Sequence, residues 1–110
     1  MLKLKANPTF KAKVEIPIPG GEKVAVEFEF KHMPRSEFEG WLNERRAQIE
    51  EGIKPNQDVD TIMKVACGWS GVDGDFTRDN VALFLDQYHA ASRCIGEAYG
   101  RELMQLRLGN

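Results

Sequence analysis

The stretch FKAKVEIPIPGGEKVAVEFEFK, from Phe10 to Lys31, decides the fold of this chain. Apolar residues stand at even-numbered positions on both sides of the Pro-Gly-Gly sequence, and most residues between them are charged. Strict alternation is typical of half-buried strands, and turn residues between two such runs predict an antiparallel β-hairpin. Because both apolar sets are even-numbered and share one face, the loop has an odd number of residues, most simply Gly20–Glu22. Pro17 has no amide hydrogen to donate, which suits an edge strand.

The apolar face of this hairpin needs a cover, since an isolated hairpin is marginally stable in water. Either the rest of the chain or other subunits bury it, and any apolar surface left over would mark an interaction site. The candidate residues of this face are Val14, Ile16, Val26, Phe28 and Phe30.

Downstream of Pro34 the apolar period becomes that of a helix. Ser36 and Glu39 have the spacing of a capping box, which predicts that Ser36 caps a first helix. Gly52 is placed to end that helix, because glycine readily adopts the left-handed conformation of a helix C-terminus.

Three more helices are expected: one that begins at Asn56–Asp58, one capped by Thr77, and one from about Ala90 to Leu106. The second helix is predicted to bury Ile62, Val65, Ala66 and Trp69. The expected fold class is therefore α+β, with an N-terminal antiparallel β-hairpin followed by about four α-helices. Residues 1–110 are expected to form a single domain, with residues 1–33 as the hairpin part and residues 34–110 as the helical part.

Charge and hydropathy exclude several classes of protein. Residues 1–35 carry seven basic and four acidic side chains, whereas residues 36–110 carry eight basic and thirteen acidic ones. This asymmetry provides a basic end and an acidic end for docking onto a partner or another copy. Nucleic-acid binding needs a concentrated basic face, and Arg45 and Arg46 have glutamates at helical spacing that predict a solvated, salt-bridged surface. No run approaches the ~20 apolar residues of a membrane helix.

The N-terminal residues contain no apolar run of the signal-peptide kind, so we expect a cytoplasmic protein that binds neither nucleic acid nor membranes. Cys67 and Cys94 lie in apolar helical patterns without a CxxC spacing. They are expected to be buried free thiols.

The acidic loop GWSGVDGDFTRDN, from Gly68 to Asn80, raises the question of a metal site. Asp73, Asp75 and Asp79 resemble part of a calcium-binding loop, but Arg78 replaces the glycine that such a loop needs, and its bidentate glutamate is missing. We interpret the segment as a turn between two helices, with a calcium module left as an alternative.

Catalytic chemistry has little support in the sequence. His32 and His89 have no serine, cysteine or carboxylate in a recognisable nucleophile–base arrangement. An enzymatic function therefore remains an alternative only if the fold places a carboxylate or thiol next to one of these histidines. We expect no catalytic residues, no metal and no cofactor.

The C-terminal half carries an ordered set of motifs. A Trp-x-Gly-Val sequence precedes a short loop, a Thr-capped helix with Leu-x-x-Tyr follows, and a later helix starts with small residues, contains Ala-Tyr and leads to Gly109–Asn110. In this combination the chain resembles the small tail assembly chaperones of tailed bacteriophages and prophages, although His89 stands where that family often has proline. The candidate partner-binding or motif residues, which are alternatively core residues, are Trp69, Gly71, Val72, Phe76, Leu85, Tyr88 and Tyr99.

The resemblance implies a non-enzymatic protein that binds the tape measure protein, keeps it soluble and helps to recruit tail tube subunits. It also implies a place in the host bacterial cytoplasm and absence from the mature virion. Self-association is expected from the exposed strand edge and the two charged ends. The alternative is a structural minor tail or head–tail joining protein of a phage or prophage, which would be found in purified particles.

Overall fold

The predicted hairpin is present in the computed structural model, which describes residues 1–104. β1 (Thr9–Pro17) and β2 (Lys23–Lys31) are antiparallel, and Val14 lies opposite Val26. The even-numbered apolar residues therefore share one face, as the alternation predicts. β1 is an edge strand, which agrees with the proline at its end.

The hairpin loop has the expected odd length, but its position is shifted. The N–H of Ile18 donates to the carbonyl of Glu22 at 2.9 Å, so Pro19–Gly21 form the turn instead of the predicted Gly20–Glu22. The two glycines have φ angles of 104° and 90°, which residues with a side chain rarely adopt. The odd number of loop residues was therefore predicted correctly, whereas the predicted pairing register of the two strands was wrong.

A third strand replaces part of the predicted second helix. α2 (Gln57–Val65) begins as expected but ends before β3 (Ala66–Ser70), which pairs antiparallel with β2 and places Trp69 opposite Phe28. The prediction that Ala66 and Trp69 lie on a helix was therefore wrong. Gly68 is a poor helix former, and the open edge of β2 offers backbone hydrogen bonds that a longer helix would leave unmade.

The first helix starts earlier than predicted. α1 (Arg35–Glu51) has Pro34 at its N-cap, and no side chain makes a capping hydrogen bond there. Ser36 lies inside the first turn, so the predicted capping box is absent. Gly52 ends the helix as expected, with a φ of 86° and its N–H directed to the carbonyl of Ile49.

The remaining helices agree with the sequence pattern. Thr77 caps α3 (Arg78–Gln87), and its hydroxyl oxygen accepts a hydrogen bond from the N–H of Asn80 at 3.1 Å. α4 (Ala91–Met104) follows after a short turn. The predicted end of this helix at Leu106 lies outside the described residues, and so do the motif residues Gly109 and Asn110. An α+β fold with a hairpin followed by four helices is thus confirmed.

The cap at Thr77 and the absence of a cap at Ser36 give a matched test of local stability. Thr77→Ala removes a side-chain hydrogen bond to the helix and should lower the free energy of unfolding by about 1 kcal/mol. Ser36→Ala removes no capping bond and should change it by less than about 0.5 kcal/mol. Urea denaturation of the two variants measures both values, and equal losses would contradict the assigned caps.

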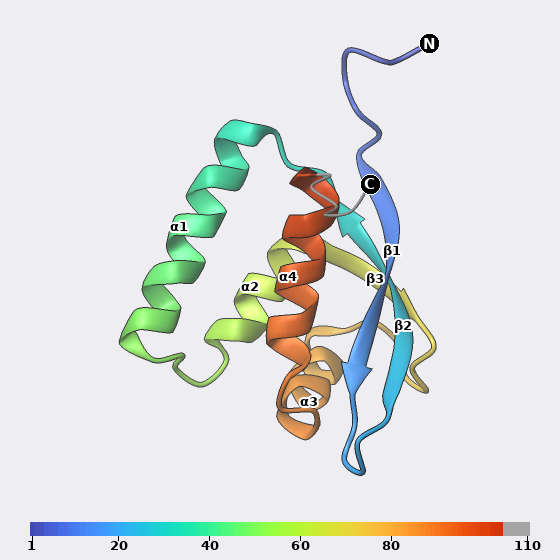
Figure 1. Ribbon diagram of the computed structural model, residues 1–110, viewed down its shortest axis with the longest axis vertical. Coiled ribbons are helices and arrows are strands. Elements are labelled where there is room, and N and C mark those ends of the chain that lie inside the picture. Colours follow the sequence, from blue (N-terminus) through green and yellow to red (C-terminus); the bar gives the residue numbers. More distant parts are fainter. Residues whose placement is uncertain (105–110) are drawn as a thin grey trace.

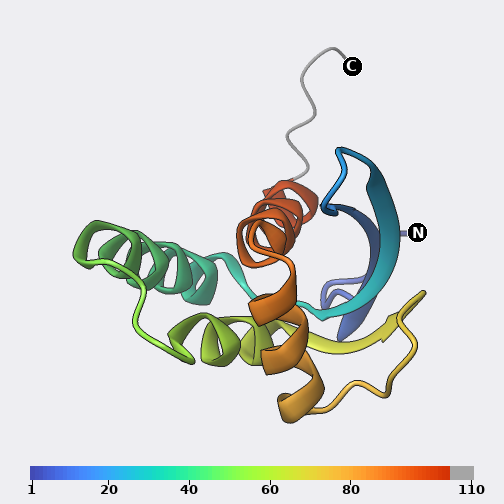
Figure 2. The same ribbon diagram turned by 90° about the horizontal axis from the view of Figure 1, so that it is seen from below.

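The helices cover one side of a strongly curved sheet. Figure 2 shows α4 on the concave side of the hairpin, with α1 on the far side of α4 from the strands. Figure 1 shows α3 beside the hairpin turn, at the opposite end of the molecule from the N-terminus. The apolar face of the hairpin could be covered by helices of the same chain or by other subunits. The helices of the same chain cover it, because the residues of this face are nearly inaccessible to solvent. These residues, buried in the core, are Val14, Ile16, Val26, Phe28 and Phe30.

α1 is attached to α4 by a side chain that was expected in solvent. The guanidinium of Arg45 lies 5.8 Å from the centre of the Trp41 ring and donates to the carbonyl of Ser92 at 3.4 Å. Gly96 leaves room for it, because a β-carbon there would collide with the guanidinium. Burial lowers the pKa of Arg45. Arg46 is exposed, as predicted.

Candidate functional site

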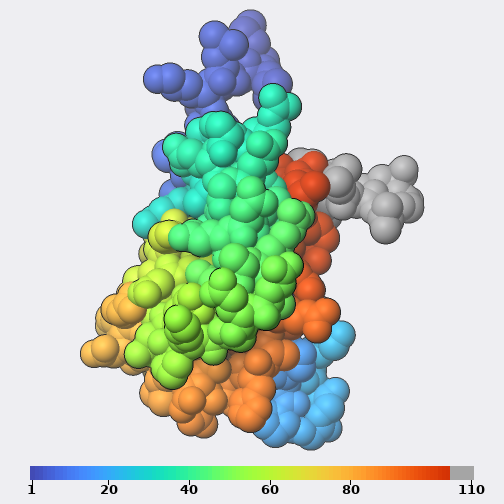
Figure 3. All heavy atoms as spheres, turned by 90° about the vertical axis from the view of Figure 1, so that its left-hand side faces the viewer, coloured from blue at the N-terminus to red at the C-terminus, as the bar shows by residue number. Residues whose placement is uncertain are grey.

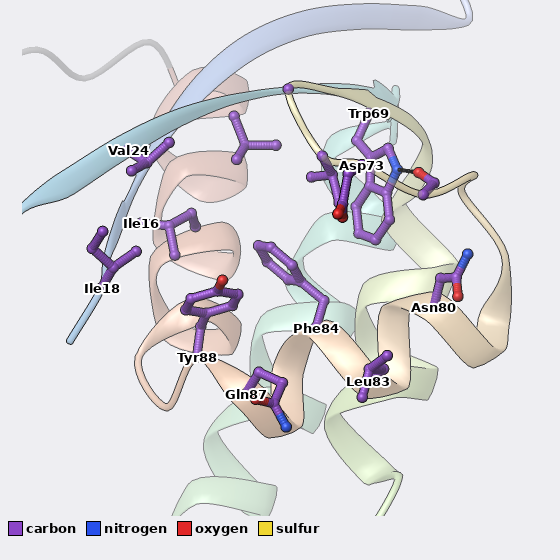
Figure 4. A pocket seen from close by; sticks show the side chains of 14 residues that line it. Ile16, Ile18, Val24, Trp69, Asp73, Asn80, Leu83, Phe84, Gln87 and Tyr88 are labelled. Carbon is purple, nitrogen blue, oxygen red and sulfur yellow. Dashed lines mark hydrogen bonds between the residues drawn. The ribbon is translucent and has the colours of Figure 1, made fainter.

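An apolar groove of about 640 Å³ opens between the hairpin turn, the β3–α3 loop and α3. Figure 4 shows Ile16 and Val24 of the hairpin on one side and Phe84 and Tyr88 on the other, around a common space. Its volume lies within the range of roughly 300–1,000 Å³ that is usual for binding sites.

The two rims of the groove expose large apolar side chains. Val24, at the start of β2, is 43% exposed, and Leu83, on α3, is 58% exposed. The floor between them is formed by buried residues of the hairpin face, among them Ile16 and Val26. Apolar side chains left in water on both sides of a hollow are typical of a surface that a partner covers.

Trp69 forms the end wall. Its ring lies 5.2 Å from Phe76 at nearly a right angle, and 5.3 Å from Phe84, measured between ring centres. The indole N–H donates to the carbonyl of Gly74 at 2.8 Å. This bond ties strand β3 to the loop that follows it, so the wall is formed before any partner binds.

The loop itself is held at two further points. The side-chain amide of Asn80 donates to the carbonyl of Asp75 at 2.8 Å. Gly71 has a φ of 96°, and a β-carbon there would lie 3.5 Å from the carbonyl oxygen of Ala25. Glycine therefore allows the loop to turn tightly against β2. The predicted role of the loop as a turn is confirmed, but it joins β3 to α3 rather than two helices.

The chemistry of the groove favours binding over catalysis. Asp73 is the charged side chain among the described lining residues, which include no histidine, cysteine, lysine or arginine. A single carboxylate without a basic partner or nucleophile provides no acid–base pair. The arrangement can bury apolar side chains and attract a positive charge at its edge.

The structure brings part of the motif set together. Trp69, Gly71, Val72 and Tyr88 line the groove, with Tyr88 directly after α3. Phe76 is half-buried behind the tryptophan. The remaining motif residues lie in the core instead: Leu85 and Tyr99.

Leu83 was missed by the sequence analysis. It lies off the buried stripe of α3 formed by Val81, Phe84 and Leu85, so its apolar side chain faces outward. A large apolar residue on the polar face of a helix is the signal that would have identified it.

The groups considered for other chemistry lie elsewhere. His32 and His89 are both exposed and do not line the groove. Within residues 1–104, no cluster of three or more His, Cys, Asp or Glu side chains is placed to hold a metal ion. In the same part of the chain, no helix is sufficiently long and apolar to span a membrane.

Both cysteines are free, as predicted, but neither is fully buried, which the sequence analysis had expected. Cys67 is exposed on β3, where its thiol donates to the carbonyl of Glu29 at 3.5 Å, and Cys94 is half-buried. Desolvation, together with the charge of Glu29, raises the pKa of Cys67. This thiol is therefore a poor nucleophile.

Comparison with known protein families finds a match over the chain. A family model described as phage tail assembly chaperone covers residues 1–110. No curated protein and no solved structure matches the chain.

Proposed function

The chain belongs to the phage tail assembly chaperone family, and we propose that it binds the tape measure protein during tail assembly. In this proposal apolar side chains of the tape measure protein enter the groove between the hairpin and α3. The protein has no catalytic role, acts in the host cytoplasm, helps to recruit tail tube subunits and is absent from the finished particle.

The groove is the observation that carries this proposal. It combines a preformed wall, a buried apolar floor and two exposed apolar rims, Val24 and Leu83. Burying such rims stabilises a complex by about 25 cal/mol per Å² of apolar surface removed from water. A chaperone that keeps an apolar client soluble needs a surface of this kind.

Co-expression with fragments of the tape measure protein of the same phage or prophage tests the function. We expect at least one fragment that is insoluble alone to be recovered as a soluble complex, detected by size-exclusion chromatography with light scattering. An unrelated insoluble protein co-expressed in the same way serves as the control. Fragments that stay insoluble in every case, with no complex formed, would contradict client binding.

The structural alternative makes an opposite prediction about location. A minor tail or head–tail joining protein is retained in purified particles, whereas an assembly chaperone is lost from them. Quantitative mass spectrometry of purified particles measures this directly. Stoichiometric recovery of the chain would overturn the proposed absence from the virion.

A further inference from the structure

The N-terminal arm (Met1–Asn7) is apolar, basic and separate from the core, whereas the carbonyl of Pro8 already accepts a hydrogen bond from the N–H of His32 at 2.9 Å. Leu2 and Leu4 are almost fully exposed, at 97% and 107%, and neither belongs to the core cluster. Lys3 donates to the side chain of Asn7 at 3.2 Å, a contact within the arm itself. Figure 3 shows the arm projecting from one end of the molecule.

The alternation in this arm resembles a strand. In extended conformation Leu2 and Leu4 lie on one side of the backbone, and Lys3 and Lys5 lie on the other. Two exposed leucines at this spacing form a small apolar face that residues 9–104 leave uncovered.

The groove has the complementary properties. Its walls and floor are mainly apolar, and its charged lining residue is Asp73. Asp75 and Asp79 follow in the adjoining loop and first helical turn, while the one cation of that segment, Arg78, pairs with Asp60. The surroundings of the groove therefore attract a basic, apolar peptide.

The arm cannot place both of its leucines in the groove of its own chain, because Leu4 does not reach that far. The arm joins β1 at Thr9, the first residue of the strand. The groove lies at the other end of the strand, near Ile16 and the hairpin turn. This length of β1 is about 23 Å at a rise of about 3.3 Å per residue. The chain from Leu4 to Thr9, reversed along the strand and fully extended, covers at most roughly 18 Å.

We propose that the N-terminal arm of one copy docks in the groove of a second copy when no client is bound. Leu2 and Leu4 enter between Val24 and Leu83, and the positive charges of Lys3 and Lys5 are attracted to the aspartates of the β3–α3 loop. The inference rests on the proposed function in one respect, namely that the arm and the client compete for one groove. The arm thereby keeps the apolar groove covered until a client displaces it.

This contact joins two different surfaces, so it is heterologous. Figure 1 shows the N-terminus at one end of the molecule, and at the other end the hairpin turn and α3, which border the groove. A contact of this kind closes as a dimer if two antiparallel copies exchange arms, and otherwise extends to further copies or closes into a ring. Association should therefore grow with concentration, and it should weaken with salt because charges contribute to it.

The first test compares the association of four proteins by sedimentation velocity up to about 1 mM. These are the unchanged chain, the arm variant Leu2→Ser/Leu4→Ser, the groove variant Leu83→Glu and the control Ile49→Glu. Ile49 is a matched control because it is 58% exposed, like Leu83, but lies on α1 away from the groove. We expect association to weaken roughly tenfold or more in the arm and groove variants, and to stay unchanged in the control.

Mixing the two defective variants gives the sharper result. The Leu83→Glu chain retains its arm, and the Leu2→Ser/Leu4→Ser chain retains its groove. We expect the mixture to form a one-to-one complex that grows no further, because one arm and one groove remain compatible. A mixture that stays monomeric, an arm variant that associates like the unchanged chain, or an unchanged chain that is monomeric throughout would each overturn the proposal.

Client binding is measured separately, so that the two proposals fail independently. The arm variant keeps an open groove and should bind a tape measure fragment at least as tightly as the unchanged chain. Loss of self-association with client binding retained supports docking of the arm. If no client binds while the mixed variants still form their complex, the proposed function fails and the inference about the arm stands.

Discussion

Replacing Tyr99 with alanine is expected to lower the free energy of unfolding by roughly 3–5 kcal/mol, as for other large buried aromatic residues. The side chain is completely buried in the core. Its ring centre lies 5.2 Å from those of both Phe30 and Trp41, and 6.0 Å from that of Phe10. It thus connects both strands of the hairpin, α1 and α4. Small domains are stable by only ~5–15 kcal/mol, so this loss would leave little reserve.

Tyr99→Phe separates the ring from the hydroxyl group. The hydroxyl donates to the carbonyl of Lys31 at 2.7 Å in a part-buried hydrogen bond, and its removal should cost about 1 kcal/mol, the usual net contribution of such a bond. Guanidinium denaturation followed by Trp41 and Trp69 fluorescence measures both variants. Stability of the alanine variant equal to that of the phenylalanine variant would contradict the central role of the ring.

The same side chain should make stability depend on alkaline pH. Burial, with a smaller contribution from Glu37, raises the pKa of Tyr99 to about 12. Above its ordinary pKa of about 10 the unfolded chain loses this proton first, so it binds fewer protons than the folded chain. The contribution is fully present below pH 10 and is lost as the pH rises toward 12. Tyr99→Phe should show a smaller loss of stability over this interval than the unchanged chain.

The rims of the groove should dominate client affinity. Leu83→Glu introduces a charge where we expect an apolar side chain of the client, and binding should weaken by about 30-fold, corresponding to about 2 kcal/mol for a central interface residue. Val24→Glu should act in the same direction from the opposite rim. Because both residues are largely exposed in the free chain, the free energy of unfolding should change by less than about 0.5 kcal/mol.

Isothermal titration with a soluble tape measure fragment measures this loss. Ile49→Glu again provides the matched control, because it adds the same charge at an equally exposed apolar position on α1. An equal loss in the control would indicate an effect of net charge. Unchanged affinity in both rim variants would place the client elsewhere and contradict the groove as its site.

The sequence alone identified part of the candidate site. Trp69, Gly71, Val72 and Tyr88 were selected as motif residues, and all four line the groove. Leu83 was not selected, because only the packing of α3 reveals that it faces outward. Whether a residue of the hairpin face ends in the groove or under a helix depends on the curvature of the sheet, which the period of the sequence does not report.

β3 shows why a local pattern misled. Ile62, Val65 and Trp69 fall at helical spacing, and a strand of five residues is too short to display its own period clearly. This segment forms a strand because the edge of β2, which is distant in the sequence, supplies backbone hydrogen bonds to Ala66–Ser70.

The sequence by itself determined the hairpin, its shared apolar face, the edge position of β1 and the cap at Thr77. Each of these depends on residues close together in the chain, through side-chain alternation, turn chemistry or a single hydrogen bond. Contacts between distant segments, in contrast, determine that Ala66–Ser70 form a strand, that Arg45 packs on α4 and that Val24 and Leu83 stay exposed on the two sides of the groove. Residues 1–104 leave the apolar side chains of Val24 and Leu83 exposed, so the groove stays open to solvent.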